Sequence, residues 1–396
     1  MTSLARTDRS AVTEWRRTID WPILIASFAL LGVGLLVSLS AGPPAAEKLG
    51  YASYHYVYRH VFFVVIAAMV LVVTSVLKVE WVRRFSALIY VGCLVLMLIV
   101  LMSGHEAKGA QRWIRFAGFT LQPSEMIKPA LIVLAGWLLA QRELFPKGPW
   151  TIISFCLYAV VVLLLLLQPD VGQSVLLTAG FLVAFYVAGL PWRWGAGFAG
   201  GGAALGGVLY LTMPHVRDRV HIFLVPSSSD TYQIDKAAEA ISNGGLFGVG
   251  PGEGAVKFQL PDAHTDFIYS VLSEEFGLIA ALAVLAMYTL IVARGCMLAS
   301  RIEDLYPRAA ATGLFALFGL QAAINIAVNV SLIPPKGMTL PLISSGGSSL
   351  IGTALTLGLA LALVRRHGAH IRWRNCVLYT SPSPRDQRGS RMPSSA

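Results

Sequence analysis

Long apolar segments constrain this chain more than any other feature of its sequence. A helix that crosses the hydrocarbon core of a bilayer needs about 20 apolar residues. Ten segments meet that requirement, at approximately 21–40, 59–77, 86–103, 125–140, 151–168, 171–190, 195–212, 267–293, 309–331 and 341–364. Only 13% of the residues are charged, about half the fraction found in soluble proteins. The sequence therefore predicts an all-α polytopic membrane protein with about ten transmembrane helices.

Basic residues predict the orientation of these helices. Lys and Arg concentrate in residues 1–20, in alternate loops and directly after the last apolar segment, and such residues mark the cytoplasmic side. We therefore expect a cytoplasmic N-terminal segment 1–20, a transmembrane domain 21–366 and a cytoplasmic tail 367–396. The first apolar segment lacks an A-x-A cleavage site and is interpreted as a retained anchor. This topology explains the net charge of +10, so membrane lipids are expected partners and nucleic acid is not.

The C-terminal residues differ in character from the rest of the chain. From about Cys376 the sequence is rich in Ser, Pro and Arg, lacks periodicity and resembles translated adapter read-through. A disordered native tail is the alternative. The four cysteines form no CxxC motif or Cys/His cluster, so neither a disulfide framework nor a zinc site is predicted.

The stretch "LPDAHTDFIYSVLSEEFG", residues 260–277, introduces acids at the start of the eighth apolar segment. Ionisable groups at membrane depth are costly and usually face a functional cavity. Helix capping explains Thr265 or Asp266, but not Glu274 and Glu275, which lie more than two turns further on. Helical spacing places on one face Asp266, Ser270, Ser273 and Glu274. The pattern favours a polar stripe that faces the protein interior over capping alone.

Two loops on the predicted outer side carry an unusual number of basic residues. The first covers about 104–124, and the second covers about 213–266 between the seventh and eighth helices. A loop as long as the second is usually functional or disordered. Its stretch "DTYQIDKAAEAISNGG" has apolar residues at helical spacing and ends in Asn243-Gly244. We predict a helix there, either on the membrane surface or against the bundle.

Charged residues also cluster where the first loop meets the fourth apolar segment. In "QPSEMIK", Pro123 suits an early helix position, and Glu125 and Lys128 can pair at i, i+3. A weak surface ion pair is the alternative. Upstream, Trp113 stands between Arg112 and Arg115, whose guanidinium groups suit phosphate. Trp113 fits an interfacial anchor at least as well as a ligand role.

The second loop adds Arg217, Arg219 and Lys257 to the acids described above. A carboxylate near several cations at a bilayer surface suits a lipid pyrophosphate, with the cations on the phosphates and the acid as a base. "GVGPGEG" lacks the pattern of a nucleotide-binding loop, so a flexible turn is the better interpretation. His264 is interpreted as structural. Asn325 and Asn329, at i, i+4, either join helices or line a cavity.

Six motifs together resemble one known family. They are "GAQRW", "QPSEMIK", "QPDVGQ", "GGLFGVGPGEG", "LPDAHTDFIYSVLSEEFG" and "KGMTLPLISSGGSS". The chain resembles the SEDS family, the FtsW/RodA/SpoVE membrane proteins of bacterial wall synthesis, from about Trp21 to Arg366. "GPGEG…K" and "LPDAHTDF" look more like the division branch than the elongation branch. Ser345 departs from the family, which more often has Tyr there, and this puts the role of its loop in doubt.

The resemblance implies ten transmembrane helices and peptidoglycan glycosyltransferase activity on lipid II, with a β-1,4 linkage formed by inversion. The family's essential acid corresponds to Asp266, as the base on the acceptor hydroxyl. Glu125 would orient Lys128, and cations would neutralise the leaving diphosphate. The predicted substrate-binding residues are Arg112, Trp113, Gln122, Glu125, Lys128, Arg217, Lys257, His264, Thr265, Glu274, Ser344, Ser345 and Gly346. No residue is predicted to ligate a metal, and no organic cofactor is expected.

The resemblance also implies partners and a location. A class B penicillin-binding protein and other division proteins are expected partners, in the bacterial inner membrane at the septum. A divalent cation, Mg²⁺ or Mn²⁺, could bridge the diphosphate. The alternatives are an elongation polymerase, a lipid II flippase, or a scaffold that only recruits the transpeptidase.

Overall fold

The computed structural model of this chain describes residues 11–365, apart from a small set of positions. Those outside the described set are 49, 104, 108, 109, 117, 118, 169, 213, 215, 216, 218–231, 261 and 334–336, together with both termini. The chain divides after Arg365 into a helical unit and a C-terminal unit. The whole C-terminal unit, including the suspected read-through, lies outside the described residues.

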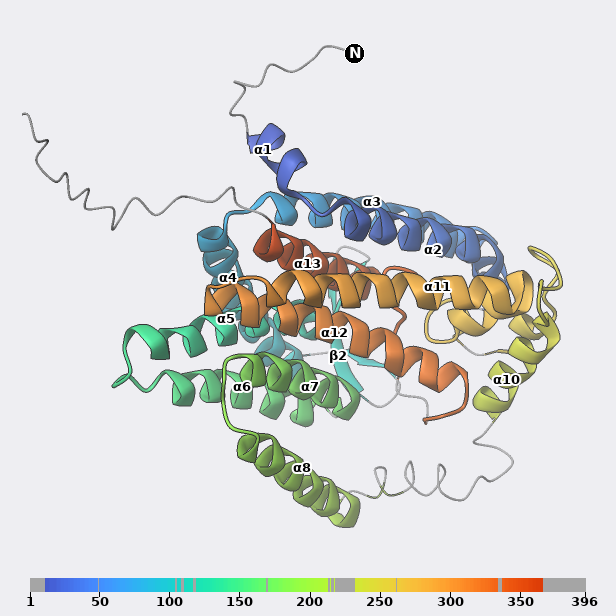
Figure 1. Cartoon of the computed structure of the whole chain (residues 1–396). Coiled ribbons are helices and arrows are strands. Elements are labelled where there is room, and N and C mark those ends of the chain that lie inside the picture. Colours follow the sequence, from blue (N-terminus) through green and yellow to red (C-terminus); the bar gives the residue numbers. More distant parts are fainter. Residues whose placement is uncertain are drawn as a thin grey trace, which may run out of the picture. The chain divides into compact units, whose positions relative to one another are not determined.

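Ten helices correspond one by one to the ten predicted apolar segments (Figure 1). They are α2 (Trp21–Lys48), α3 (His55–Val76), α4 (Val79–Ser103), α5 (Pro123–Leu144), α6 (Trp150–Leu167), α7 (Val171–Val187), α8 (Arg193–Thr212), α11 (Ile268–Ser300), α12 (Leu305–Asn329) and α13 (Gly347–Val364). Within the described residues, eight of them are long and apolar enough to cross a membrane. The exceptions are α7, which has 17 residues, and α8.

Within the described residues, three short helical elements lie outside this set. The N-terminal α1 (Ala11–Thr18) precedes α2, and its Trp15 indole donates to the Ser75 hydroxyl at 2.9 Å. In the long loop, α10 (Tyr232–Gly244) confirms the predicted helix and its end at Gly244. Its predicted cap, Asp230 or Thr231, lies outside the described residues. A 3₁₀ turn, η1 (Val256–Phe258), follows.

The helices α5 and α13 form the centre of the bundle. In the most apolar 18-residue stretch of each helix, 83% of α5 and 89% of α13 lies buried in the protein, against 28% of α4 and of α6. Helix α13 packs on α3, α5 and α12, as Figure 1 shows. The close packing of α13 on α5 depends on Gly352, because a methyl group there would meet the Glu125 carbonyl at 2.8 Å. The apolar surface of α4 and α6 is left for lipid.

A small antiparallel sheet joins α4 to α5, where the sequence predicts only a loop. It contains β1 (His105–Ala107), β2 (Ala110–Phe116) and β3 (Phe119–Leu121), in the order β1-β2-β3. Helices α3, α5, α7, α11 and α13 begin at this end of the bundle, which we call the sheet end. Contacts fix the arrangement: Arg59 in α3 donates to Thr120 of β3, and Ser348 in α13 donates to the Thr120 carbonyl.

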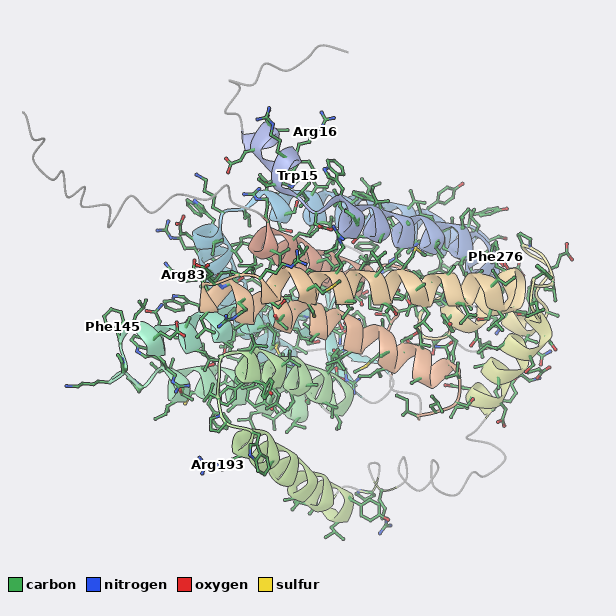
Figure 2. All side chains as sticks on the ribbon, viewed as in Figure 1. Trp15, Arg16, Arg83, Phe145, Arg193 and Phe276 are labelled. Atoms are coloured by element: carbon green, nitrogen blue, oxygen red, sulfur yellow. The ribbon has the colours of Figure 1, made fainter. Side chains whose placement is uncertain are left out.

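The opposite end carries basic side chains and the cytoplasmic loops predicted from the sequence. In Figure 2, Arg83 and Phe145 mark this end, and Phe276 lies toward the sheet end. Arg294 pairs with Asp20 at 2.8 Å near the start of α2. Arg365, at the end of α13, donates to the Val76 carbonyl at 3.1 Å. These residues close the bundle opposite the functional motifs.

Candidate functional site

The backbone of Asp266 is held by two buried asparagines of α12. The Asp266 carbonyl accepts hydrogen bonds from Asn325 Nδ2 at 2.8 Å and from Asn329 Nδ2 at 3.1 Å. Both asparagines are almost fully buried, whereas the Asp266 residue is partly exposed. Asp266 lies two residues before α11 rather than within it. The asparagine pair that the sequence left unassigned therefore joins α12 to the start of α11.

Asn329 also supplies the cap that α11 lacks in its own sequence. The residue at the cap position, Phe267, has no side-chain acceptor for the first turn. Asn329 Oδ1 instead accepts from the Ser270 backbone N–H at 3.1 Å and from its hydroxyl at 2.7 Å. An oxygen that accepts from the third N–H of a helix is the usual capping arrangement. The Asn329 side chain thus fixes both the start of α11 and Asp266, two residues before it.

The segment 337–346 supports the same stretch from another side. Ser344 donates to the Thr265 carbonyl at 2.6 Å, and the Ser345 backbone N–H donates to the His264 carbonyl at 3.1 Å. Gly337 adopts φ +64, and a methyl group on it would lie 3.8 Å from Asp266 Oδ2. Residues 264–266 are therefore held through their carbonyls, and Gly337 leaves space beside the Asp266 carboxylate.

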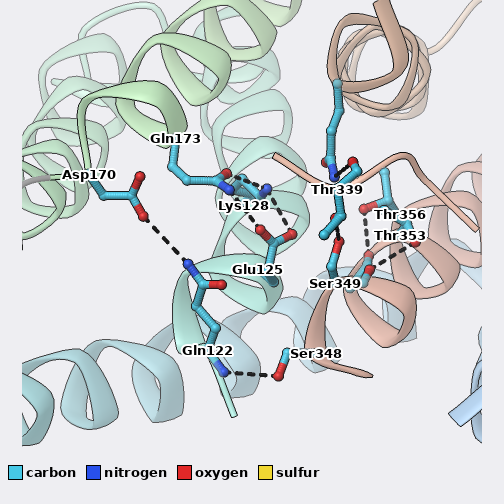
Figure 3. Close-up of polar contacts among 12 residues, drawn as sticks. Gln122, Glu125, Lys128, Asp170, Gln173, Thr339, Ser348, Ser349, Thr353 and Thr356 are labelled. Atoms are coloured by element: carbon cyan, nitrogen blue, oxygen red, sulfur yellow. Dashed lines mark hydrogen bonds and ion pairs between the residues drawn. The ribbon is translucent and has the colours of Figure 1, made fainter. Parts of the chain in front are cut away.

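A second polar cluster is closed inside the bundle (Figure 3). Lys128 Nζ lies 2.9 Å from Glu125 Oε2 and 2.7 Å from Gln173 Oε1, and Gln173 Nε2 donates to Glu125 Oε1 at 2.8 Å. All three side chains are buried. The predicted Glu125–Lys128 pair is confirmed. Its burial in the first turns of α5 excludes the weak surface ion pair that was the alternative.

Asp170, at the start of α7, links this cluster to the sheet. Its carboxylate lies 3.5 Å from Arg112 of β2 and accepts from Gln122 Nε2 at 3.5 Å. Burial raises the pKa of the Asp170 carboxyl, and the Arg112 guanidinium offsets part of that rise. Arg112 also donates to the Gln168 carbonyl at 3.2 Å. The guanidinium group is 22% exposed, so it can still reach an anion at the sheet end.

A third cluster holds the glycine-rich part of the long loop. Lys257 Nζ lies 2.6 Å from Glu275 Oε1 and donates to Ser40 in α2 and to the Gly252 carbonyl, each at 2.7 Å. The Glu274 carboxylate accepts the backbone N–H groups of Val256 at 2.8 Å and Lys257 at 3.3 Å. The side chains of Lys257, Glu274 and Glu275 are buried. Both glutamates therefore serve the loop structure.

Comparison with known sequences identifies the family. The model of the family described as "Cell cycle protein", FtsW/RodA/SpoVE, matches residues 22–368. The chain belongs to the FtsW/RodA/SpoVE family.

Individual relatives cover most of the chain. It is 48% identical over 372 residues to the "Probable peptidoglycan glycosyltransferase FtsW" of Caulobacter vibrioides, which covers 93% of this chain and 95% of the relative. The protein of the same name from Marinobacter nauticus is 37% identical, over 85% and 87% of the two chains.

Solved structures share the fold. A chain of the structure titled "Structural coordination of polymerization and crosslinking by a peptidoglycan synthase complex" is 28% identical, with a TM-score of 0.72 over 87% of this chain and 97% of the other. The rod shape determining protein RodA of Thermus thermophilus gives a TM-score of 0.63 at 28% identity, over 87% and 96%. The polytopic helical membrane fold expected of an FtsW/RodA/SpoVE protein is thus confirmed, with the small sheet between α4 and α5 as an unpredicted addition.

The structure brings together part of the predicted site and separates the rest. Asp266, His264, Thr265, Ser344 and Ser345 lie together. Gln122 and Arg112 lie together near Asp170, and Gly346 stands at the cap position of α13. Trp113 pairs across the sheet with His105 and is partly buried. The side chain of Arg217 is exposed. The predicted stripe is confirmed for Ser270, Ser273 and Glu274, which are all buried.

Two residues that were predicted to bind the substrate, Lys257 and Glu274, are instead bonded to other parts of the chain. Lys257 is buried against Glu275 and Ser40, so its charge is already paired. Glu274 is buried against loop N–H groups. Because a buried charge needs its partners to offset desolvation, neither side chain is available to a ligand at the sheet end. Lys128 is likewise enclosed, and can act on a substrate only by positioning its neighbours.

Sequence reasoning missed several residues of the site. Gln173 completes the Glu125–Lys128 cluster, and its only sequence signal is its place in "QPDVGQ". Arg59, at the start of α3, donates to Thr120 at 3.0 Å and brings a further cation to the sheet end. The roles of Asn325 and Asn329 depend on a partner about 60 residues away, which no local pattern reveals.

Proposed function

We propose that this chain is the peptidoglycan glycosyltransferase that joins lipid II into β-1,4 glycan strands during septal wall synthesis. Support for the activity comes from relatives named as probable peptidoglycan glycosyltransferases, which align with almost the whole chain. Their FtsW name favours the division role over the elongation role. The observation that carries the site is the clamp on Asp266, a partly exposed carboxylate whose backbone is fixed by buried amides.

In this proposal Asp266 is the general base. It takes the proton from the 4-hydroxyl of the acceptor GlcNAc while that oxygen attacks the anomeric carbon of the donor MurNAc. The bond from the anomeric carbon to the diphosphate oxygen breaks, and undecaprenyl pyrophosphate leaves with the bonding electrons. A single displacement inverts the anomeric centre, and one base is sufficient because the diphosphate is already a good leaving group. Fixing the carbonyl of Asp266 limits how far its carboxylate can drift from the attacking oxygen.

The diphosphate needs positive charge more than it needs a proton. Among the described residues, Arg112 and Arg59 bring cations to the sheet end, and we propose that Arg217, which is exposed, adds a third. The starts of α3, α5, α7, α11 and α13 add the partial positive charge of helix N-termini. Lys128 and Glu125 would support the α5 and α7 starts from within. Trp113, His264, Thr265, Ser345 and Gly346, which are partly exposed, would line the sugar and lipid path, and the buried Gln122 and Ser344 would position them.

A divalent cation would be carried by the diphosphate itself. Within the described residues there is no group of three or more His, Cys, Asp or Glu side chains that could hold a metal. These residues do not fit a metal held by the protein, so we derive no step through Mg²⁺ or Mn²⁺.

The chain is a multipass membrane protein. We propose that the sheet end faces the outside of the bacterial inner membrane, that both termini are cytoplasmic, and that a class B penicillin-binding protein binds it at the septum. The positive charge at the opposite end supports this orientation. Similarity to a chain of a peptidoglycan synthase complex supports an assembly with a crosslinking partner.

The activity is tested in proteoliposomes that contain the purified chain and its penicillin-binding protein, with the transpeptidase blocked. Fluorescent lipid II is added, and glycan strands are scored on a gel while a membrane-impermeant quencher reports translocation of the label. Strands support the polymerase. Translocation without strands would assign a flippase instead. The absence of both strands and translocation would contradict both activities.

A further inference from the structure

Helix α11 is interrupted near the sheet end, and a turn of the long loop fills the interruption. Gly277 has φ 78 and ψ 179, which is not helical. The N–H groups of Leu278 and Ile279 therefore lose their acceptors one turn back. They donate instead to the carbonyls of Gly245 at 2.9 Å and Leu246 at 3.3 Å. Phe276, labelled in Figure 2, immediately precedes the interruption.

The carbonyl groups before the interruption are satisfied by the same turn. The Glu274 carbonyl accepts from Val249 N–H at 3.0 Å, and the Glu275 carbonyl accepts from Gly250 N–H at 3.1 Å. Unpaired backbone groups are too costly to leave in a membrane environment. The turn 245–250 is therefore an integral part of α11 and not a loosely attached loop.

Glycines allow this close backbone contact. A methyl group on Gly248 would overlap the Glu275 carbonyl, and one on Gly277 would overlap the Gly248 backbone. Both residues also have positive φ, which favours glycine. The Lys257–Glu275 ion pair then fastens the loop just beyond the turn. The position of the turn is fixed along α11.

The outer surface of this fixed turn is apolar and exposed. Phe247 is 80% exposed and Leu246 is 60% exposed, and Val249 is exposed beside them. On α11 the neighbouring Leu278 and Ile279 are also exposed. The turn thus continues the apolar surface that α11 presents outside the bundle.

The position along α11 indicates what covers this surface. Asp20 directly precedes the first apolar segment, so we place the opposite membrane boundary at Arg294, which pairs with Asp20. Fifteen residues separate Arg294 from Ile279, which is about 22 Å along a helix axis at ~1.5 Å per residue. The hydrocarbon core is about 30 Å thick. Ile279, and with it the turn bonded to its backbone, lies within the hydrocarbon depth of the bilayer half nearest the sheet end.

We propose that Leu246, Phe247 and Val249 form a membrane-inserted tip that contacts the acyl chains of phospholipids in that leaflet. The tip holds the loop that leads to Asp266 at a fixed depth in the bilayer. The buried backbone of the turn is satisfied by α11, which is the condition for non-helical chain at this depth. The proposal does not depend on the activity proposed above.

Photo-crosslinking in nanodiscs of phosphatidylcholine and phosphatidylglycerol tests the tip. The full chain carries p-benzoylphenylalanine in place of Phe247, of Leu282 or of Glu253. Leu282 is an exposed α11 residue in the apolar span, and Glu253 is an exposed polar residue of the same loop. All three positions are exposed, so folding is preserved, and size-exclusion chromatography checks it.

Intact mass spectrometry then measures phospholipid adducts. We expect phospholipid adducts from the probe at Phe247 and at Leu282, and no adducts from the probe at Glu253. Adducts at Phe247 no more abundant than at Glu253 would overturn the proposal. A second set of nanodiscs includes the penicillin-binding protein. Replacement of the lipid adduct at Phe247 by a cross-link to that protein would also overturn it, and would assign the surface to a protein partner.

Discussion

Two acids of one short stretch, Asp266 and Glu275, have opposite surroundings. The Asp266 backbone is clamped by Asn325 and Asn329, and the residue is partly exposed beside Gly337. The Glu275 side chain is buried and paired with Lys257 at 2.6 Å. Nine residues apart in sequence, one acid is partly exposed and the other is buried in an ion pair, and we propose that only the first acts on a ligand. Burial and partners, rather than residue type, separate a chemical role from a structural one.

The largest expected effect is on catalysis by Asp266→Asn. The amide keeps the shape of the side chain but cannot accept the proton, so we expect the polymerisation rate to fall by about 10²–10⁴-fold, the range for general base catalysis. The unfolding temperature should stay near that of the wild type. Normal strand synthesis by this variant would remove the distinction between the two acids.

The matching change on the structural side is Glu275→Gln. It leaves the Lys257 ammonium buried without its counter-ion, which costs about 3–5 kcal/mol of stability. Activity per folded molecule should change little. The double variant Lys257→Met/Glu275→Leu removes both charges and should recover much of the loss. Thermal unfolding in detergent measures all three proteins, and an unchanged unfolding temperature in Glu275→Gln would contradict the structural role.

A smaller effect is expected from Asn329→Asp, which acts on Asp266 through its backbone. A carboxylate at this position can accept from Ser270 but cannot donate to the Asp266 carbonyl. A displacement of about 1 Å can cost about 10²-fold in rate, so kcat should fall by that order while KM for lipid II stays constant. Thr312→Asp is the control, because it places a carboxylate on α12 away from this stretch, where the Thr312 hydroxyl donates to the Arg308 carbonyl of the same helix. Equal losses in both variants would argue against the clamp.

The smallest effect concerns Asp170, which is intermediate between the two cases because it is buried but only loosely paired with Arg112. Burial raises its pKa in the folded protein above the ordinary 3.8. Between those two pKa values the folded state binds more protons than the unfolded state, so the free energy of unfolding falls as pH rises. Asp170→Asn should remove this dependence. Unfolding temperatures in a pH series that begins near 3.8 would show it, and parallel curves for the two proteins would contradict it.

The helices and one ion pair could be predicted because their signals are local. Apolar runs about 20 residues long indicate each of the ten helices, and the spacing of Glu125 and Lys128 indicates their pairing. The third member of their cluster, Gln173, and the approach of α13 at Gly352 could not be predicted, because both come from other helices. Lys257 bonds to Ser40 and Glu275, and these two partners come from two other helices. A run of "SEEFG" likewise gives no sign that a distant turn fills the break that follows it.

The most direct test compares Asp266→Asn and Glu275→Gln in one experiment. The polymerisation rate on fluorescent lipid II and the unfolding temperature are measured for both variants beside the wild type, in complex with the penicillin-binding protein. We expect Asp266→Asn to lower the polymerisation rate and leave the unfolding temperature unchanged. We expect Glu275→Gln to lower the unfolding temperature and leave the rate per folded molecule unchanged. The opposite pattern, or the same loss in both variants, would contradict it.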